Sequence, residues 1–179
     1  RIPAGVYHFA PHEFALRLIR HGDYRELLID ATAGTQHICQ SPATLIFTTL
    51  FWRSTWKYRS RGYRYCYWDT GTVISNLLST ATACQVSTEL ITGFVDSQIN
   101  HILSIDGVKE SAACLIPLSG TTPYLPINAP PELESVESNN EHAHLPSITY
   151  PDLEALHLES SLITPQEVLE WRAKASRNQ

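Results

Sequence analysis

The apolar positions near the start of the chain change period several times. GVYHF at 5–9 alternates as a short strand, and HEFALRLIRHG at 12–22 places its large apolar side chains on a roughly helical stripe that ends at Gly22. DYRELLIDATAG at 23–34 has the same form, with Asp23 as a candidate N-cap and Gly34 as the stop. The pattern therefore predicts a strand followed by two helices.

The middle of the chain alternates between strands and helices. SPATLIFTTLF at 41–51 has the length and β-branched content of a buried central strand. Apolar residues then recur at steps of three and four, which predicts a long helix that begins near Tyr63 or Tyr65 and ends near Cys84. A strand at 87–94, a helix capped by Asp96 and a strand at 111–120, apolar on both faces, complete this part.

The character of the sequence changes after residue 120. Residues 121–150 are rich in Pro, Glu, Ser and Asn and read as a linker or an arm, and residues 151–179 predict a helical extension of two short helices. Thr164 and Pro165 suit the N-cap and first position of the second helix. We expect residues 1–120 to be an α+β domain whose mixed sheet is flanked by helices.

Composition narrows the classes of function. The 179 residues are 43% hydrophobic and 17% charged, as in an ordinary folded protein, and the net charge of −5 gives no general attraction for polyanions. No signal peptide or long apolar run occurs, so we expect a cytoplasmic protein without a membrane partner. The chain has no Met and begins directly in a strand-like pattern, so we expect residue 1 to be an internal position of a longer protein.

Metal-binding patterns are weak. The four cysteines are far apart and form no CxxC pair, which argues against structural zinc. His142 and His144 are adjacent in the linker but have no third ligand nearby in the sequence. We expect no metal site, and we assign no role to the other histidines.

One segment departs from the acidic character of the chain. Residues 52–71, WRSTWKYRSRGYRYCYWDTG, hold five of the thirteen Lys and Arg residues, three of the four Trp and four of the eight Tyr. Cations with aromatics are typical of single-stranded nucleic-acid surfaces. Because the molecule as a whole is acidic, we favour no nucleic acid and interpret this cationic–aromatic segment as the wall of a small-molecule pocket.

Several spaced motifs resemble the FMN-dependent nitroreductase superfamily, and more narrowly its SagB-type dehydrogenase branch, which includes azoline oxidases. They are AGVYHFAPHEFALRLIRHGD, FWRSTWKYRSRGYRYCYWDTGTVISNLL, ITGFVDSQINHILSIDG and ACLIPLSG, spanning about residues 4–120. The resemblance implies the second half of a nitroreductase-like domain, with a mixed sheet wrapped by helices. It also implies a homodimer, or two fused halves, with FMN at the interface and a small-molecule or modified-peptide substrate. The segment 151–179 resembles the lead-in that precedes such a domain, so the resemblance implies that it leads into a further domain.

Lys57 and Tyr58 match the Lys-Tyr pair that the azoline-oxidising branch places near the flavin. Oxidation of an azoline removes a proton from carbon and transfers a hydride to flavin N5. A lysine can take up that proton only in its neutral form, which burial or neighbouring cations favour, and Tyr58 could orient the substrate or relay the proton. The alternative is a surface charge beside a packed aromatic ring.

Thr92 and Gly93 fall where the superfamily's strand passes the flavin edge and a backbone N–H points at N5 or O4. Glycine suits such a place because the absence of Cβ lets the main chain approach a ring closely. The alternative is an ordinary turn before the helix that Asp96 opens. Arg61, Arg64 and Asp69 are expected to be structural, with one of the arginines paired to Asp69 or to a backbone carbonyl where the long helix starts.

Three departures from the family pattern support a second hypothesis. Thr72 stands where members often have His after D-x-G, ATACQVS lacks the Gly-rich turn after the long helix, and the phosphate-binding Arg of the first half is absent. The sequence therefore leaves two hypotheses open. One is an FMN-dependent oxidoreductase of the SagB type; the other is a degenerate, non-catalytic half that acts as a structural pseudo-subunit.

Overall fold

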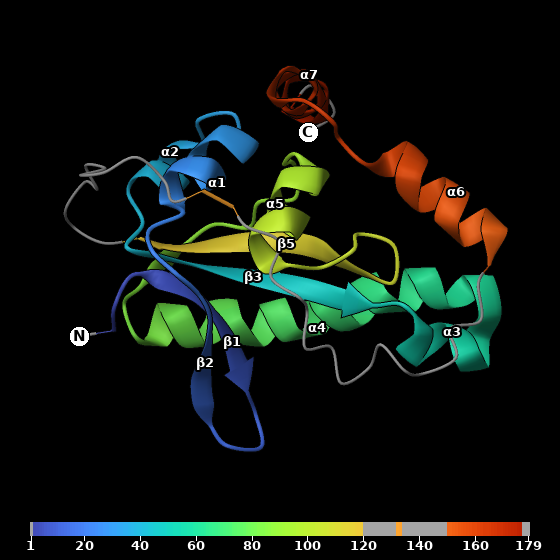
Figure 1. The fold of residues 1–179 in the computed structure, drawn as a ribbon, viewed down its shortest axis with the longest axis horizontal. Helices are drawn as coiled ribbons and strands as arrows, with labels where there is room; N and C mark the ends of the chain where they lie inside the picture. Colours follow the sequence, from blue (N-terminus) through green and yellow to red (C-terminus); the bar gives the residue numbers. More distant parts are fainter. Residues whose placement is uncertain (1, 120–131, 134–149, 177–179) are drawn as a thin grey trace.

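The computed structural model describes residues 2–119, 132–133 and 150–176. In these residues a two-stranded hairpin, β1-β2, stands beside a three-stranded sheet in the order β3-β5-β4, with helices on both faces (Figure 1). The predicted α+β architecture is confirmed. The elements in chain order are β1 (Gly5–Ala10), β2 (Ala15–His21), α1 (Arg25–Ala31), α2 (Gln36–Cys39), β3 (Ala43–Leu50), α3 (Trp52–Tyr58), the 3-10 helix η1 (Arg59–Arg61), α4 (Gly62–Ala83), β4 (Ser87–Thr88), α5 (Asp96–Leu103), β5 (Glu110–Ser119), α6 (Pro151–Ser160) and α7 (Pro165–Ser176).

The helix predicted at 12–22 is wrong, because this segment forms β2 and pairs antiparallel with β1. The tight turn between the strands ends at Phe14, which has a positive φ of 49°. The decisive contact is remote in sequence. Arg20 is buried, and its guanidinium donates to the carbonyls of Ile102 (3.0 Å) and His101 (3.2 Å) and to Ser104 Oγ (2.8 Å) at the end of α5.

Strand β5, not the predicted 41–51 strand, is central among the described strands. It pairs antiparallel with β3 on one side and with β4 on the other, and it is apolar on both faces as predicted. A bulge at Ala113 separates the pairs Phe47↔Cys114 and Thr48↔Ala112. Because the extra residue reverses the alternation, Cys114 packs toward α4 whereas Ala112 packs on the opposite face.

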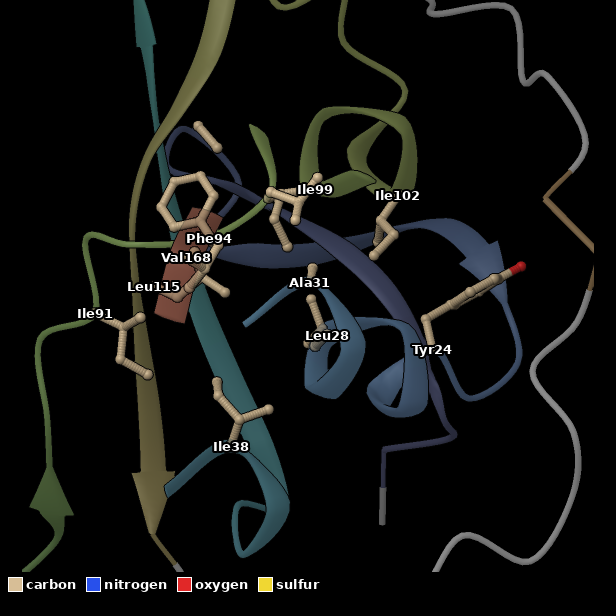
Figure 2. Packing of buried hydrophobic residues seen from close by; sticks show 12 residues of the cluster. Tyr24, Leu28, Ala31, Ile38, Ile91, Phe94, Ile99, Ile102, Leu115 and Val168 are labelled. Atoms are coloured by element: carbon tan, nitrogen blue, oxygen red, sulfur yellow. The ribbon is translucent and has the colours of Figure 1, made fainter. Parts of the chain in front are cut away.

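Each face of the sheet carries its own apolar cluster. The larger cluster joins β5 to α1, α2, α5 and α7, as Figure 2 shows for Leu28, Ile99, Leu115 and Val168. On the other face, Ile74 of α4 packs with Cys114 and Ile116. Burial in this layer raises the pKa of the Cys114 thiol to about 11, so this cysteine behaves as a small apolar side chain.

The predicted helical extension packs against the domain. Thr164 Oγ1 accepts from the N–H of Glu167 (3.2 Å), which confirms the predicted cap of α7. Before that cap, the Leu162 N–H donates to the Asp96 carboxylate (2.8 Å) and the Asp96 N–H donates to the Leu162 carbonyl (3.1 Å). Val168 of α7 is fully buried in the larger cluster. The extension therefore completes the core beside α5.

The predicted linker and the absence of a membrane span can be compared with the structure only in part. Most of the linker predicted at 121–150, including His142 and His144, lies outside the described residues. Within the described residues, none of the helices has the length and apolar content needed to cross a membrane.

Candidate functional site

The predicted catalytic pair lies at the end of α3, and both residues are exposed. Lys57 Nζ lies 5.2 Å from the centroid of the Tyr58 ring, so the ammonium contacts its own neighbour. The Tyr58 ring is 44% exposed and meets the Tyr65 ring edge-on at 4.5 Å. A cation over an exposed ring contributes only about 0.5–1 kcal/mol. The structure therefore brings Lys57 and Tyr58 together but leaves the ammonium hydrated.

The ring contacts continue along α4. Tyr65 packs against Trp68 at 5.3 Å, and the Arg64 guanidinium lies 5.8 Å from the Trp68 ring centroid. We call Lys57, Tyr58, Arg64, Tyr65 and Trp68 the cationic–aromatic surface. Among the described residues Asp69 makes no ion pair with Arg61 or Arg64, so the predicted pairing of an arginine with Asp69 is wrong. Stacking on rings, not charge pairing, orders this surface.

Thr92 and Gly93 lie in a short segment fixed at both ends. Before it, Ile91 and Leu115 of β5 exchange two backbone hydrogen bonds of 2.9 Å. After it, the Val95 N–H donates to the Ala31 carbonyl (2.8 Å), which ties the segment to the end of α1. Thr92 is exposed and Gly93 is buried. Two anchors only four residues apart hold the main chain of this segment in place.

Gly93 is covered by the indole of Trp171 from α7. A Cβ atom built on Gly93 would lie 2.6 Å from Cε3 and 2.7 Å from Cζ3 of that indole, so any larger residue would require the indole to move. No described residue accepts a hydrogen bond from the Gly93 N–H. Buried backbone N–H groups without an acceptor are rare in folded proteins. The segment thus offers a main-chain donor with no acceptor among the described residues, at a glycine against which a flat ring packs. Both features suit a planar ligand with an acceptor at its edge.

The two predicted pairs are not neighbours. The chain enters α3 where the Phe51 N–H donates to the Lys109 carbonyl, whereas the segment with Gly93 is anchored at Leu115. These points are about 20 Å apart along β5 at a rise of about 3.4 Å per residue. Figure 1 shows α3 beyond the tip of β3, away from α7.

A hollow in the described part of the chain lies elsewhere. It has a volume of about 330 Å³ and contains none of the predicted site residues. Its lining is mainly apolar and comes from Leu77, Thr80, Ala81, Cys84, Val86 and Leu118. It therefore adds nothing to the two predicted pairs.

His157 of α6 is a buried polar residue that the sequence reasoning missed. Its Nε2 lies 3.0 Å from the Gly107 carbonyl and its Nδ1 lies 3.3 Å from the Tyr63 hydroxyl. Because a carbonyl can only accept, Nε2 donates. In the neutral ring Nδ1 then accepts from Tyr63. The spacing of four between Leu153 and His157, both buried on one face of α6, was the signal that could have revealed it.

Tyr67 extends this network toward the surface. Its hydroxyl donates to that of Tyr63 (3.2 Å), and burial together with this contact raises the pKa of Tyr67 well above its ordinary value. Burial also raises the pKa of Asp96, although the hydrogen bond from the Leu162 N–H opposes the effect. Asp96 was predicted as a helix cap, but its carboxylate holds the segment between α6 and α7. Both groups stabilise the way α6 and α7 pack on the domain.

The chain is similar in sequence to several known proteins. The sequence model of the Nitroreductase family matches residues 8–120. The chain is 29% identical over 117 residues to MJ1384 of Methanocaldococcus jannaschii, which is named as a nitroreductase. It is 26% identical over 102 residues to the Microcin B17-processing protein McbC of Escherichia coli. These matches cover 65% and 56% of the chain.

Two solved structures share the fold. A nitroreductase-type protein from Anabaena variabilis aligns with a TM-score of 0.70 at 23% identity over 90% of the chain. The E. coli microcin synthetase McbBCD complex aligns with a TM-score of 0.60 at 20% identity over 68% of the chain. The chain spans 58% and 38% of the two curated relatives, and 33% and 46% of the two solved chains. It thus corresponds to about half or less of most of these proteins.

Proposed function

Because the chain belongs to the nitroreductase family, we propose that it forms part of an FMN-dependent oxidoreductase of the SagB-type dehydrogenase kind. The reaction would transfer a hydride to or from flavin N5, on an azoline-type or another small substrate. The similarity to McbC, a microcin-processing protein, supports this branch. The solved McbBCD complex contains truncated pro-MccB17, which supports a modified peptide as one class of substrate. We place the activity in the cytoplasm.

The proposal rests mainly on the environment of Gly93. This residue combines a buried main chain, no side chain, and an N–H without an acceptor among the described residues. The edge of an isoalloxazine ring carries acceptor atoms that such a donor can bind. Gly93 would hold that edge and the exposed Thr92 hydroxyl would lie beside it. Bound FMN would supply hydride transfer, and the two anchored ends of the segment would keep the donor in position.

Lys57 and Tyr58 need a second lobe to take part in this chemistry. Their attachment point beside β5 lies about 20 Å from that of Gly93, and both side chains are exposed. We therefore propose that the site is completed between two lobes, either in a homodimer or with a fused second nitroreductase-like domain. Lys57 would then meet a flavin held by the other lobe, where burial would favour its neutral form.

The first test is the visible absorbance of the purified full-length protein. We expect the spectrum of bound flavin, and we expect Gly93→Val to lose it because a branched side chain leaves no approach to the main chain. Ser97→Val, an exposed change in the first turn of α5, is the control and keeps the flavin. A Gly93→Val protein that binds FMN as well as the wild type contradicts the assignment.

The second test addresses Lys57 directly. Lys57→Ala is expected to retain flavin and to lose substrate turnover, because the proton acceptor is removed while the ring site is untouched. Arg61→Ala, which removes another exposed cation close to α3, is the control for a general effect of charge. Turnover that is unchanged in Lys57→Ala removes this residue from the mechanism.

A non-catalytic pseudo-subunit is the second candidate function. It is favoured by the Trp171 indole lying directly on Gly93 and by the separation of the two predicted pairs. A colourless full-length protein that cannot be reconstituted with FMN, yet forms a stable complex with a flavin-binding lobe, would support it. Flavin bound in proportion to this chain would refute it.

A further inference from the structure

Trp171 has an unusual position for an aromatic residue on a surface helix. Its side chain is 41% exposed, so one part of the indole meets solvent while Cε3 and Cζ3 lie where a Cβ of residue 93 would be. The indole is thus a flat ring laid on a bare stretch of main chain. The Gly93 N–H has no acceptor among the described residues.

The helix that carries Trp171 is held by other contacts. Val168, one turn earlier on α7, is fully buried in the larger apolar cluster. The Arg172 guanidinium donates to the Thr32 carbonyl and to Thr35 Oγ1, both at 2.8 Å. None of these contacts involves the indole. The Trp171 side chain can therefore leave Gly93 while α7 stays in place.

We propose that Trp171 is an internal plug, whose indole occupies the place over Gly93 that the ring of FMN would take. Binding of FMN to this chain then requires the indole to turn away into solvent. The inference rests on the proposed function, because it assumes that Gly93 is the flavin contact. It extends that function to a chain that blocks its own site.

The plug predicts how the affinity for FMN changes when the indole is removed. A ligand that binds only the open form has its apparent affinity reduced by the fraction of molecules in that form. The closed form is the one that the structure shows. Removing the indole should raise the affinity for FMN, whereas a residue that stacked on the flavin would lower it when removed. The sign of the change therefore separates the two roles.

The experiment is a titration of the flavin-free full-length protein with FMN, followed by flavin fluorescence. Trp171→Ala is expected to lower the dissociation constant by about tenfold or more. Trp171→Phe, which keeps a flat ring, should stay within about threefold of the wild type. Leu169→Ala, a large-to-small change at an exposed position of the same helix, is the matched control and should leave the affinity unchanged.

A second measurement does not depend on flavin. Hydrogen exchange of the Gly93 amide should be about tenfold faster in Trp171→Ala than in the wild type, because the indole that packs on Gly93 is gone and no described residue accepts from this N–H. The Ile99 amide, which donates to the Val95 carbonyl in α5, should exchange at the same rate in both proteins.

The outcomes separate the plug from the proposed function. If FMN binds the wild type as tightly as Trp171→Ala, or more tightly, the plug is overturned and the flavin site stands. If Gly93 exchange is unchanged in the variant, the indole is not a cover and the plug is overturned. If neither protein binds FMN although Gly93 exchanges faster in Trp171→Ala, the proposed flavin site fails and the plug fails with it.

Discussion

Replacing Gly93 with alanine adds one methyl group at a point where the structure leaves no room for it. The new Cβ would meet Trp171 Cε3 at 2.6 Å and Cζ3 at 2.7 Å, well inside the separation that two carbon atoms tolerate. The backbone of Gly93 is not among the positive-φ positions, so alanine can adopt it without strain. The whole penalty therefore comes from the contact with the indole.

The size of the penalty follows from the indole's burial. Trp171 is 41% exposed, so somewhat more than half of its surface is covered. An aromatic side chain buries about 150–250 Å² when fully covered, which makes the covered part about 100–150 Å² and its contribution at most about 3 kcal/mol. Crowding by one methyl group costs about 1–3 kcal/mol in a packed site. We expect Gly93→Ala to lower the free energy of unfolding by that amount.

The double variant turns this estimate into a test. In a Trp171→Ala background the clash is absent, and glycine-to-alanine should then stabilise by about 0.4–1 kcal/mol by restricting the unfolded chain. Urea unfolding of the wild type, the two single variants and the double variant should give a coupling energy of about 2 kcal/mol between residues 93 and 171. If Gly93→Ala costs the same in both backgrounds, the indole does not rest on Gly93, and the reasoning about the plug is wrong.

Three further predictions concern the contacts that hold the remote segments. Arg20→Lys should lower the free energy of unfolding by about 2–4 kcal/mol, nearly as much as Arg20→Ala. The reason is that an ammonium cannot make the several hydrogen bonds that the guanidinium donates at the end of α5; urea unfolding measures the change. His157→Ala should cost about 2–4 kcal/mol in thermal unfolding, since it removes two buried hydrogen bonds and ring contacts, whereas exposed His101→Ala should change little. The pKa of Asp96 is raised in the folded protein, so the folded state keeps the proton of this carboxyl to higher pH than the unfolded chain does. Protonated Asp96 therefore contributes to stability below the ordinary pKa of 3.8, and this contribution is lost as the pH rises toward the pKa of the folded state. Asp96→Asn, which can still accept from the Leu162 N–H, should therefore be at least as stable as the wild type at about pH 7, with the difference narrowing toward about pH 4; unfolding at the two pH values measures it.

The sequence predicted secondary structure well where one periodic pattern of apolar residues continued over many positions. The helix expected from near Tyr63 to Cys84 is α4 at Gly62–Ala83, and Thr164 caps α7 as its position before proline indicated. These features depend on neighbours within about one turn of the chain. Sequence motifs also indicated the nitroreductase family, which the match over residues 8–120 confirms.

The hairpin was mispredicted because its period was ambiguous. Phe14 and Leu18 are four apart, as on a helix, while Leu16 and Leu18 are two apart, as on a strand. The choice between the two was made by Arg20, whose acceptors lie at the end of α5, more than eighty residues later. No window of sequence around β2 contains that information.

The candidate site divides in the same way. Residue type alone marked Lys57-Tyr58 and Thr92-Gly93, because each matches a local motif. Their roles remain proposals, since position relative to a ring is a property of the folded chain. The contact of Trp171 with Gly93 could not be expected, because seventy-eight positions and most of a linker separate them. Packing of α7 against the core brings them together.

The amino-acid sequence by itself determined the helical and extended segments, the acidic balance of the chain, and the motifs by which its family is recognised. Only the tertiary structure decided which glycine is covered, which histidine is buried and how far the two predicted pairs lie apart. The physical reason is the separation along the chain of the residues that interact. Periodicity, caps and charge are set by residues close in the chain, whereas burial and orphaned hydrogen bonds depend on which distant segments pack together.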